Sequence, residues 1–403
     1  MEVSLLSSRE AAFLAIAQFE QIPIHEALDI QSEQIENLSF AREVAAGTVK
    51  RLLTLKYFSK RLAPKLRLNH REKALFFSAL YQHVFMDSVP LYAIVDETTT
   101  LAKKYFGKKK GSFFHALLRR LEEFVPEVPG RKNAFDLSLR LSYPPYFIKK
   151  MLEEYGARVT IDLLEVMNAP SQVMGRFFGG KAPFSLRKVY KNVYDVGNSV
   201  RSYANSPEVY LQNATPVFLF DALRQHLSIP PSSVLDLCAS PGGKLLLAAE
   251  YFPEAHLHAN DVSEKKLCRL KENLEKYQVR ASVFQQRGEL FQSDQKYDLI
   301  LVDAPCSNSG VYHKRVEARW RFSPTALEEL SDLQAEILER AASLLAPGGQ
   351  LWYMSCSILQ EENEETIEFA DSLALTCLHQ EKVLPNRKGW DGGFACSFIR
   401  KPA

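Results

Sequence analysis

The stretch Val234–Ala248, VLDLCASPGGKLLLA, joins an apolar run to a helical pattern through Pro-Gly-Gly. The run before the glycines is typical of a buried strand, and the apolar residues after Lys244 are typical of a helix. Glycines at such a turn let the backbone approach a ligand closely, and the free N–H groups at a helix start attract acceptor atoms. The stretch therefore predicts a strand, a ligand-binding loop and a helix.

Apolar runs alternate with helical patterns throughout residues 209–403. The strand-like runs are VLDLC, HLHAND, YDLILVDAP and QLWYMSC. This alternation predicts a Rossmann-like α/β domain with a doubly wound, mostly parallel sheet. Asp261 follows Gly243 by 18 residues at the end of the next run, where a carboxylate accepts both hydroxyls of a ribose. The loop is neither GxGxxG nor GxxxxGK[ST], so the pattern indicates a nucleoside cofactor without identifying it.

Two of the six cysteines directly follow predicted strands. Cys306 closes the sequence Asp303-Ala304-Pro305-Cys306, and Cys356 lies between Ser355 and Ser357. Ligands bind at the carboxyl ends of parallel strands, so we expect both thiols and Asp303 to face the cleft of the glycine loop. A thiol that adds to carbon 6 of a pyrimidine activates carbon 5 toward a sulfonium methyl donor. The other cysteines have no CxxC or zinc-ligand spacing, so no metal site is predicted.

The first 127 residues predict a helical bundle, in which Ser7-x-x-Glu10 is a capping box. Residues 1–49 hold eight acids and two bases, whereas residues 50–73 hold nine bases and one acid. The basic segment suits RNA phosphates, or is a solvated helix face. KKYFGKKKG, at 103–111, places five lysines on a predicted turn, as a second RNA contact or an exposed loop.

The middle of the chain changes character. Residues 128–142 are rich in Pro, Gly and charge at their start and are predicted as a linker. Residues 143–208 predict a small basic α+β subdomain that positions RNA. Its bases include Arg176, Lys181, Arg187, Lys188 and Lys191. No apolar run reaches membrane-span length and the amino terminus lacks a basic leader, so we expect a cytoplasmic monomer that does not contact membranes.

Four segments together resemble a known family. VLDLCASPGGK, DAPCSNSGV, SCS with ILQEEN, and the closing GWDGGFACSFIRK are similar to the signatures of the Sun/Fmu family of small-subunit ribosomal RNA cytosine-5 methyltransferases. The helical front end resembles the RNA-binding domain of the antitermination factor NusB. The resemblance implies S-adenosylmethionine as cofactor, 16S ribosomal RNA as substrate and flipping of the target cytosine out of its stack.

The resemblance also assigns roles to individual residues. It makes Cys356 the nucleophile that attacks cytosine carbon 6, Cys306 the thiol that assists product release, and Asp303 a contact of both base and cofactor. It places the ribose on Asp261. The other cofactor-binding residues that it implies are Cys238, Ala239, Ser240, Pro241, Gly242, Gly243, Lys244 and Arg287.

Three departures leave alternatives open. Arg287 occupies the position of an acid that meets the adenine amino group in the family, and an arginine cannot accept that hydrogen bond. Glu289 or shape alone is then the alternative adenine contact. VMGRFF and RVEARW also differ from the family pattern. The chain could therefore be an RNA-binding ribosome-assembly factor without catalysis, or could modify transfer RNA.

Lys244 and the acidic run after Cys356 each have a structural interpretation as well as a functional one. Lys244 could be a helix-start lysine whose charge lies in solvent instead of a ligand contact. The acids of EENEE, residues 361–365, are predicted to favour the dipole at a helix start and not to act in catalysis.

Overall fold

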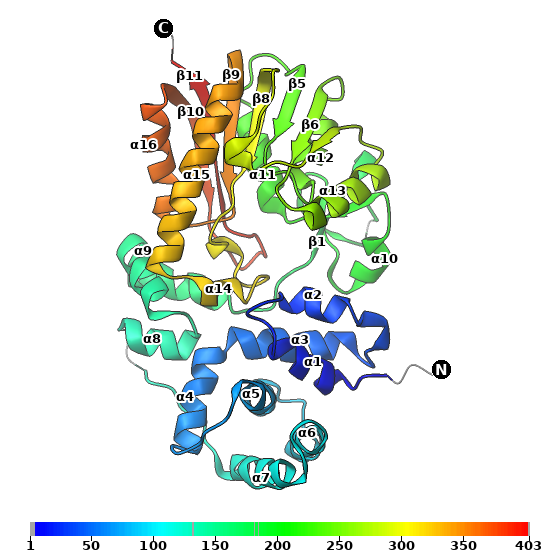
Figure 1. Cartoon of the computed structure of the whole chain (residues 1–403), viewed down its shortest axis with the longest axis vertical. Helices are drawn as coiled ribbons and strands as arrows, with labels where there is room; N and C mark the ends of the chain where they lie inside the picture. Colours follow the sequence, from blue (N-terminus) through cyan, green and yellow to red (C-terminus); the bar gives the residue numbers. More distant parts are fainter. Residues whose placement is uncertain (1–4, 131–132, 181, 184, 402–403) are drawn as a thin grey trace. The chain divides into compact units, whose positions relative to one another are not determined.

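A computed structural model describes residues 5–130, 133–180, 182–183 and 185–401 (Figure 1). The chain forms two compact units, Met1–Asn168 with Tyr312–Arg321, and Ala169–Val311 with Phe322–Ala403. The boundaries of the four predicted segments stay predictions. Lys181, and Arg131 and Lys132 of the predicted linker, lie outside the described residues. No helix in the described part of the chain is long and apolar enough to cross a membrane.

The first unit is helical, as the periodicity predicts. Its apolar faces enclose a core that includes the buried rings of Phe13, Phe58, Phe76 and Phe114. Its helices are α1 (Ser8–Ile16), α2 (Ile24–Asp29), α3 (Leu38–Lys50), α4 (Leu52–Leu62), α5 (His70–Phe85), α6 (Leu91–Phe106), α7 (Lys108–Arg119), α8 (Ala134–Leu141), α9 (Pro145–Val166) and α14 (Ala318–Arg321).

Two local predictions in this unit were wrong in part. Ser7 caps α1 by accepting from the Glu10 N–H, but the Glu10 carboxylate turns away to Lys104, 2.6 Å distant. The Lys103–Lys110 lysines do not share a turn, because Gly107 alone separates α6 from α7. Lys110 lies 2.6 Å from the buried Glu72 carboxylate. Part of the expected RNA-binding charge therefore neutralises buried acids of the unit itself.

The segment 312–321 belongs to this first unit although it directly follows the Cys306 loop in sequence. Arg319 is completely buried, and its guanidinium lies 4.1 Å from the centre of the Tyr143 ring. It donates to Asn168 Oδ1 at 3.0 Å, and burial lowers its pKa. The unusual RVEARW segment thus supplies a packing residue of the helical unit.

A seven-stranded sheet in the order β10-β11-β9-β8-β5-β6-β7 forms the centre of the second unit. The five strands from β9 to β7 are parallel, and β11 is antiparallel to both β9 and β10. The predicted doubly wound, mostly parallel α/β fold is confirmed. The strands are β5 (Ser233–Asp236), β6 (His256–Asn260), β7 (Ser282–Phe284), β8 (Tyr297–Asp303), β9 (Leu345–Ser355), β10 (Leu375–Val383) and β11 (Gly393–Arg400).

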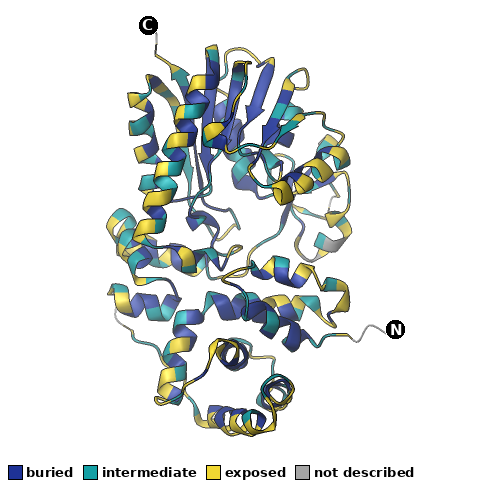
Figure 2. Ribbon diagram, viewed as in Figure 1, coloured by how far each residue is buried: buried dark blue, intermediate teal, exposed yellow. Residues whose placement is uncertain are grey.

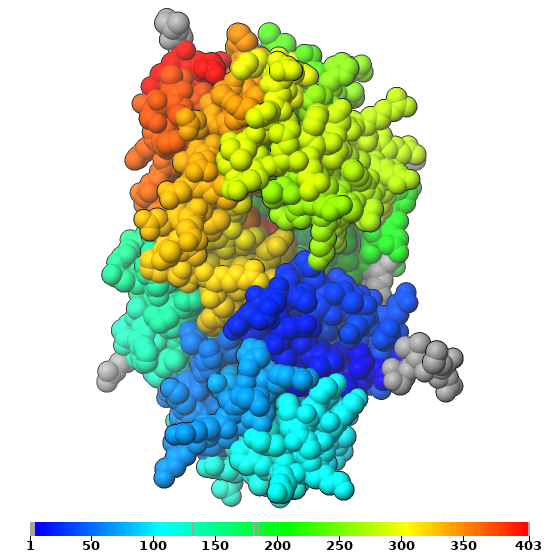
Figure 3. Space-filling model, in the orientation of Figure 1, coloured from blue at the N-terminus to red at the C-terminus, as the bar shows by residue number. Residues whose placement is uncertain are grey.

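Successive strand residues enter opposite cores, which explains the continuous apolar runs. Leu299 and Leu301 pack on the face covered by α11, α12 and α13, whereas Ile300 and Val302 face α15 and α16. Figure 2 shows that the strands are buried. Figure 3 shows the atoms of α15 and α16, in orange, at the surface of the molecule. The helices are α10 (Val200–Ala204), α11 (Ala214–Arg224), α12 (Gly243–Tyr251), α13 (Glu264–Lys276), α15 (Pro324–Leu344) and α16 (Glu364–Ser372).

A small antiparallel sheet precedes the large one in the same unit. Its strand order is β2-β3-β1-β4, from β1 (Met174–Phe177), β2 (Arg187–Tyr190), β3 (Val193–Asp195) and β4 (Val209–Leu211). Arg176 on β1 is fully buried and forms an ion pair with Glu250 of α12. It therefore anchors the small sheet to the large domain and is not exposed for RNA.

Candidate active site

The predicted site residues lie at the carboxyl ends of adjacent parallel strands. The glycine loop follows β5, Asp261 follows β6, Asp303 ends β8, and Cys356 follows β9. Strand pairing sets Asp303 opposite Met354, two residues before Cys356. The geometry thus gathers these residues at one edge of the sheet, as expected for a doubly wound fold.

The two thiols of the predicted chemistry are in contact. Cys306 Sγ lies 2.9 Å from Cys356 Sγ, and Cys356 Sγ lies 3.4 Å from Asn308 Oδ1. The hydrogen bond with Cys356 raises the pKa of Cys306, and burial and the charges of Cys356 and Glu362 raise it further. The arrangement favours Cys306 as the S–H donor and the Cys356 sulfur as its acceptor.

A cation and a carboxylate lie beside the thiols. Lys244 Nζ is 2.6 Å from Asp303 Oδ2, and the lysine side chain is only 14% exposed. Burial alone would lower the pKa of Lys244, but the charge and hydrogen bond of Asp303 raise it. The interpretation of Lys244 as a solvated helix-start lysine was therefore wrong. Lys244 is a charged group of the site.

Hydrogen bonds hold the glycine loop, which follows β5, against the end of β6. Gly242 has a φ of 106°, in the left-handed region that glycine tolerates. The Asp261 carboxylate accepts from the N–H groups of Ser240, at 3.3 Å, and Ser263, at 3.1 Å. Asn260, which sequence reasoning missed, donates to the Leu237 carbonyl at 3.0 Å. These bonds fix the loop between β5 and β6.

Polar atoms in this loop region lack hydrogen-bond partners within the described part of the chain. They are the Ser240 hydroxyl and both carboxylate oxygens of Asp236. Burial and the charge of Asp303 raise the pKa of Asp236 to about 8. Cys238 is half-buried with its sulfur facing Gly288, and burial raises the pKa of its thiol. Unsatisfied polar groups beside a glycine turn fit a polar ligand, whereas Cys238 fits a packing role.

Arg287 and Glu289 form an ion pair in the turn after β7. The Arg287 Nε lies 2.5 Å from Glu289 Oε1. The arginine side chain is 64% exposed, whereas the glutamate side chain is 9% exposed. The carboxylate of Glu289 is therefore the more buried of the two charges, and the guanidinium extends toward solvent.

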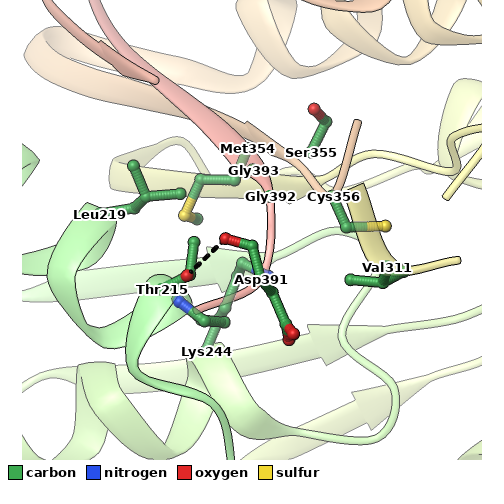
Figure 4. Close-up of a pocket in the computed structure, with 11 residues that line it drawn as sticks. Thr215, Leu219, Lys244, Val311, Met354, Ser355, Cys356, Asp391, Gly392 and Gly393 are labelled. Carbon is green, nitrogen blue, oxygen red and sulfur yellow. Dashed lines mark hydrogen bonds between the residues drawn. The ribbon is translucent and has the colours of Figure 1, made fainter. Parts of the chain in front are cut away.

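A small pocket opens beside Cys356 and Lys244 (Figure 4). Its other walls include Thr215 at the start of α11 and Asp391 before β11, neither of which sequence reasoning identified. Thr215 Oγ1 donates to the Asp391 carbonyl at 2.8 Å, and the Asp391 N–H donates to Asn213 Oδ1 at 3.0 Å. The closing Gly-rich segment was the available signal for this wall.

Glycine is required where three loops meet. Gly310 N–H donates to the Cys356 carbonyl, and Gly392 N–H donates to the Gly310 carbonyl, both at 2.9 Å. A Cβ on Gly310 would lie 2.7 Å from Gly392 Cα and 2.8 Å from the Cys356 oxygen. These glycines bring the two cysteine loops and the closing segment together.

The fold and site define a two-part protein that joins a helical domain to a Rossmann-like domain with a glycine loop and a thiol pair. Residues 228–396 match the model of the 16S rRNA methyltransferase RsmB/F family, and residues 6–123 match the NusB family. Residues 228–396 are thus similar to the RsmB/F methyltransferases, and the helical residues 6–123 are similar to the NusB family.

Curated relatives carry related names. The chain is 37% identical over 180 residues to "Ribosomal RNA small subunit methyltransferase B" of Yersinia pseudotuberculosis, serotype O:1b, and equally to that of Yersinia pestis. Each alignment covers 42% of this chain and 42% of the relative. The match thus spans less than half the length of these relatives.

Solved structures share the fold. The crystal structure of PH0851 has a TM-score of 0.82 at 22% identity and covers 98% of both chains. A methyltransferase homologue from Pyrococcus horikoshii has a TM-score of 0.58 at 23% identity and covers 67% of this chain and 99% of its own. At these identities the likeness concerns the fold alone.

Proposed function

We propose that this protein transfers a methyl group from S-adenosylmethionine to carbon 5 of a cytosine in small-subunit ribosomal RNA. The observation that carries the proposal is the contact between the Cys306 and Cys356 sulfurs, 2.9 Å apart, beside the Lys244–Asp303 ion pair. The family match and the names of the curated relatives support the same reaction and substrate class.

The residues at the glycine loop fit the proposed cofactor. The turn at Gly242 admits close backbone approach, and the Ser240 hydroxyl is unsatisfied among the described residues. Asp261 suits the ribose hydroxyls, as the resemblance implies. Val262 and Leu290 are more than half exposed although apolar, and we propose that they pack against the adenine ring. When bound, the cofactor supplies an electrophilic methyl group.

The two thiols and the Lys244–Asp303 ion pair each have a task in this chemistry. The Cys356 thiolate adds to cytosine carbon 6, and negative charge moves into the ring. Lys244 stabilises that charge, and Asp303 accepts a hydrogen bond from the exocyclic amine. Once carbon 5 has taken the methyl group, it loses its proton to a water molecule, and the electrons of that C–H bond restore the ring double bond as the bond from carbon 6 to the Cys356 sulfur breaks. Because Cys306 lies against the Cys356 sulfur, its S–H stabilises that sulfur as it leaves.

The test uses labelled S-adenosylmethionine with unmodified small-subunit ribosomal RNA. We expect the wild type to label cytosine carbon 5 and Cys356→Ala to transfer no label. Cys306→Ala is expected to accumulate a covalent protein–RNA adduct, because attack survives while release is impaired. Absence of both cofactor binding and label transfer in the wild type would refute the enzymatic proposal.

The Arg287–Glu289 ion pair favours one further candidate, an RNA-binding assembly factor with weak cofactor affinity. In that case the protein binds ribosomal RNA while labelled cofactor neither binds nor reacts. A parallel reaction with unmodified transfer RNA separates the two substrate classes. Label in transfer RNA alone would retain the chemistry and replace the proposed substrate.

A further inference from the structure

Glu362 is a completely buried carboxylate that lies six residues after Cys356. It ends the short 3-10 turn Gln360–Glu362, before α16 begins at Glu364. It was predicted to belong to an acidic helix start, but its side chain faces inward. Its Oε1 accepts from the Ser307 N–H at 2.7 Å and from Gln334 Nε2 at 3.2 Å.

The second oxygen joins the two cysteine loops. Oε2 accepts from the Ser307 hydroxyl and from the Ser357 hydroxyl, each at 2.5 Å. Ser307 directly follows Cys306, and Ser357 directly follows Cys356. One carboxylate therefore holds the residue next to each thiol.

Neighbouring bonds reinforce the same connection. Ser309 Oγ lies 2.8 Å from Ser357 Oγ and accepts from the Ile358 N–H at 2.9 Å. Asn363 Nδ2 donates to the Ser357 carbonyl at 3.1 Å. The loops are thus tied by further hydrogen bonds beside those of Glu362.

No lysine, arginine or histidine in the described part of the chain forms an ion pair with Glu362. A buried charge without a counter-ion is costly unless hydrogen bonds satisfy it, and four donors do so here. The charge also contributes to the raised pKa of Cys306, after the Cys356 hydrogen bond and burial. A packing role alone would not need a carboxylate at this place.

We propose that Glu362 is a positioning residue that holds the Cys306 and Cys356 sulfurs in contact by clamping the loops that carry them. The sulfur contact itself is a property of the folded chain, whereas its consequence for methyl transfer rests on the proposed function. The two statements can therefore fail separately.

The test uses dibromobimane, which links two thiols that lie close together by displacing two bromides. Mapping of the linked peptides distinguishes the Cys306–Cys356 link from a link between Cys377 and Cys396, whose sulfurs lie 3.0 Å apart in the β10–β11 hairpin. Because Cys396 is fully buried, a fast hairpin link would report loss of the fold, and a slow one is the internal control. In Glu362→Ala we expect the Cys306–Cys356 link to form about tenfold more slowly, with the hairpin link unchanged.

Glu364→Gln is the matched control. Glu364 lies two residues after Glu362, and it forms a partly exposed ion pair with Lys382. It should leave both cross-linking rates unchanged. Glu362→Gln keeps the side-chain shape and one acceptor oxygen, so we expect it to recover most of the Cys306–Cys356 rate. Should Glu362→Ala fail to fold, Ser357→Ala removes one of the clamping bonds and is expected to slow the same link about threefold.

Equal Cys306–Cys356 rates in the wild type, Glu362→Ala and Ser357→Ala, with a hairpin link as slow as in the wild type, would overturn the proposal. Methyl transfer is measured on the same preparations. For Glu362→Ala we expect a lower kcat and an unchanged KM for RNA. If the wild type transfers no methyl group but the cross-linking rates still change, the clamp stands and the proposed function fails.

Discussion

Two pairs of thiols lie in the same α/β unit. Their sulfur–sulfur distances are almost equal, but their surroundings differ. The sulfurs of Cys306 and Cys356 are 2.9 Å apart, and those of Cys377 and Cys396 are 3.0 Å apart. In each pair one thiol has a raised pKa, Cys306 mainly through its Cys356 hydrogen bond and Cys396 mainly through burial. Proximity of two thiols is therefore not a functional signal by itself.

The difference lies in what surrounds each pair. Cys356 lines a pocket with Lys244, and its loop follows the carboxyl end of a parallel strand. Cys377 and Cys396 lie within the antiparallel β10–β11 ladder, where Cys396 is fully buried in an apolar core. A pocket and a nearby charge pair distinguish the first site from ordinary core packing.

The largest expected effect separates the pairs by activity. Cys356→Ala should lower methyl transfer by at least about 10³-fold, because no other group supplies the proposed covalent bond to carbon 6. Cys377→Ala should leave the rate within about twofold, since that thiol lies in the hairpin ladder. Initial rates with labelled cofactor measure both. Equal losses in the two variants would remove the functional distinction between the pairs.

The next largest effect concerns the backbone around the first pair. Gly310→Ala should destabilise the fold by about 2–4 kcal/mol, because its Cβ would meet backbone atoms at 2.7–2.8 Å that cannot rotate away. Urea unfolding measures the free energy. Gly130→Ala is the control, since nothing lies within 4 Å of its added Cβ. A tolerated alanine at Gly310 would mean that the loops do not depend on this close approach.

The free energy of unfolding should depend on pH through Asp236, which lies near the first site. The pKa of Asp236 is raised from 3.8 to about 8, so its contribution to stability is fully present below pH 3.8 and is lost as the pH rises through 8. Asp236→Asn should therefore be more stabilising relative to the wild type at pH 8 than at pH 5, by at least about 1 kcal/mol. Urea unfolding at both pH values tests this. A difference that is independent of pH would contradict it.

The sequence allowed the sheet and the strand-end residues to be predicted because both follow from local patterns. Buried parallel strands produce continuous apolar runs, and their carboxyl ends locate Asp261, Asp303 and Cys356. The pocket wall could not be predicted in this way. Asn213 and Asp391 meet across 178 positions of sequence, and no local periodicity encodes that contact.

The acids after Cys356 show a subtler limit. A run of glutamates before a helix correctly indicates its start, because Glu364 and Glu365 lie in the first turn of α16. Glu362 belongs to the same run but turns inward to the serines beside the thiols. Composition predicts the average role of such a run, whereas the direction of one side chain depends on tertiary packing.

The smallest expected effect concerns the acceptor beside the Cys356 thiol. Asn308 has a φ of 60°, which glycine adopts readily, so Asn308→Gly removes the side chain without backbone strain. The Asn308 amide oxygen lies 3.4 Å from the Cys356 sulfur, so removal of this side chain opens the approach of iodoacetamide to that sulfur. We expect alkylation of Cys356 to become about two- to threefold faster, while Cys377 in the same sample reacts at its wild-type rate. A parallel acceleration at both cysteines would indicate general loosening of the unit, and an unchanged Cys356 rate would show that Asn308 does not control this thiol.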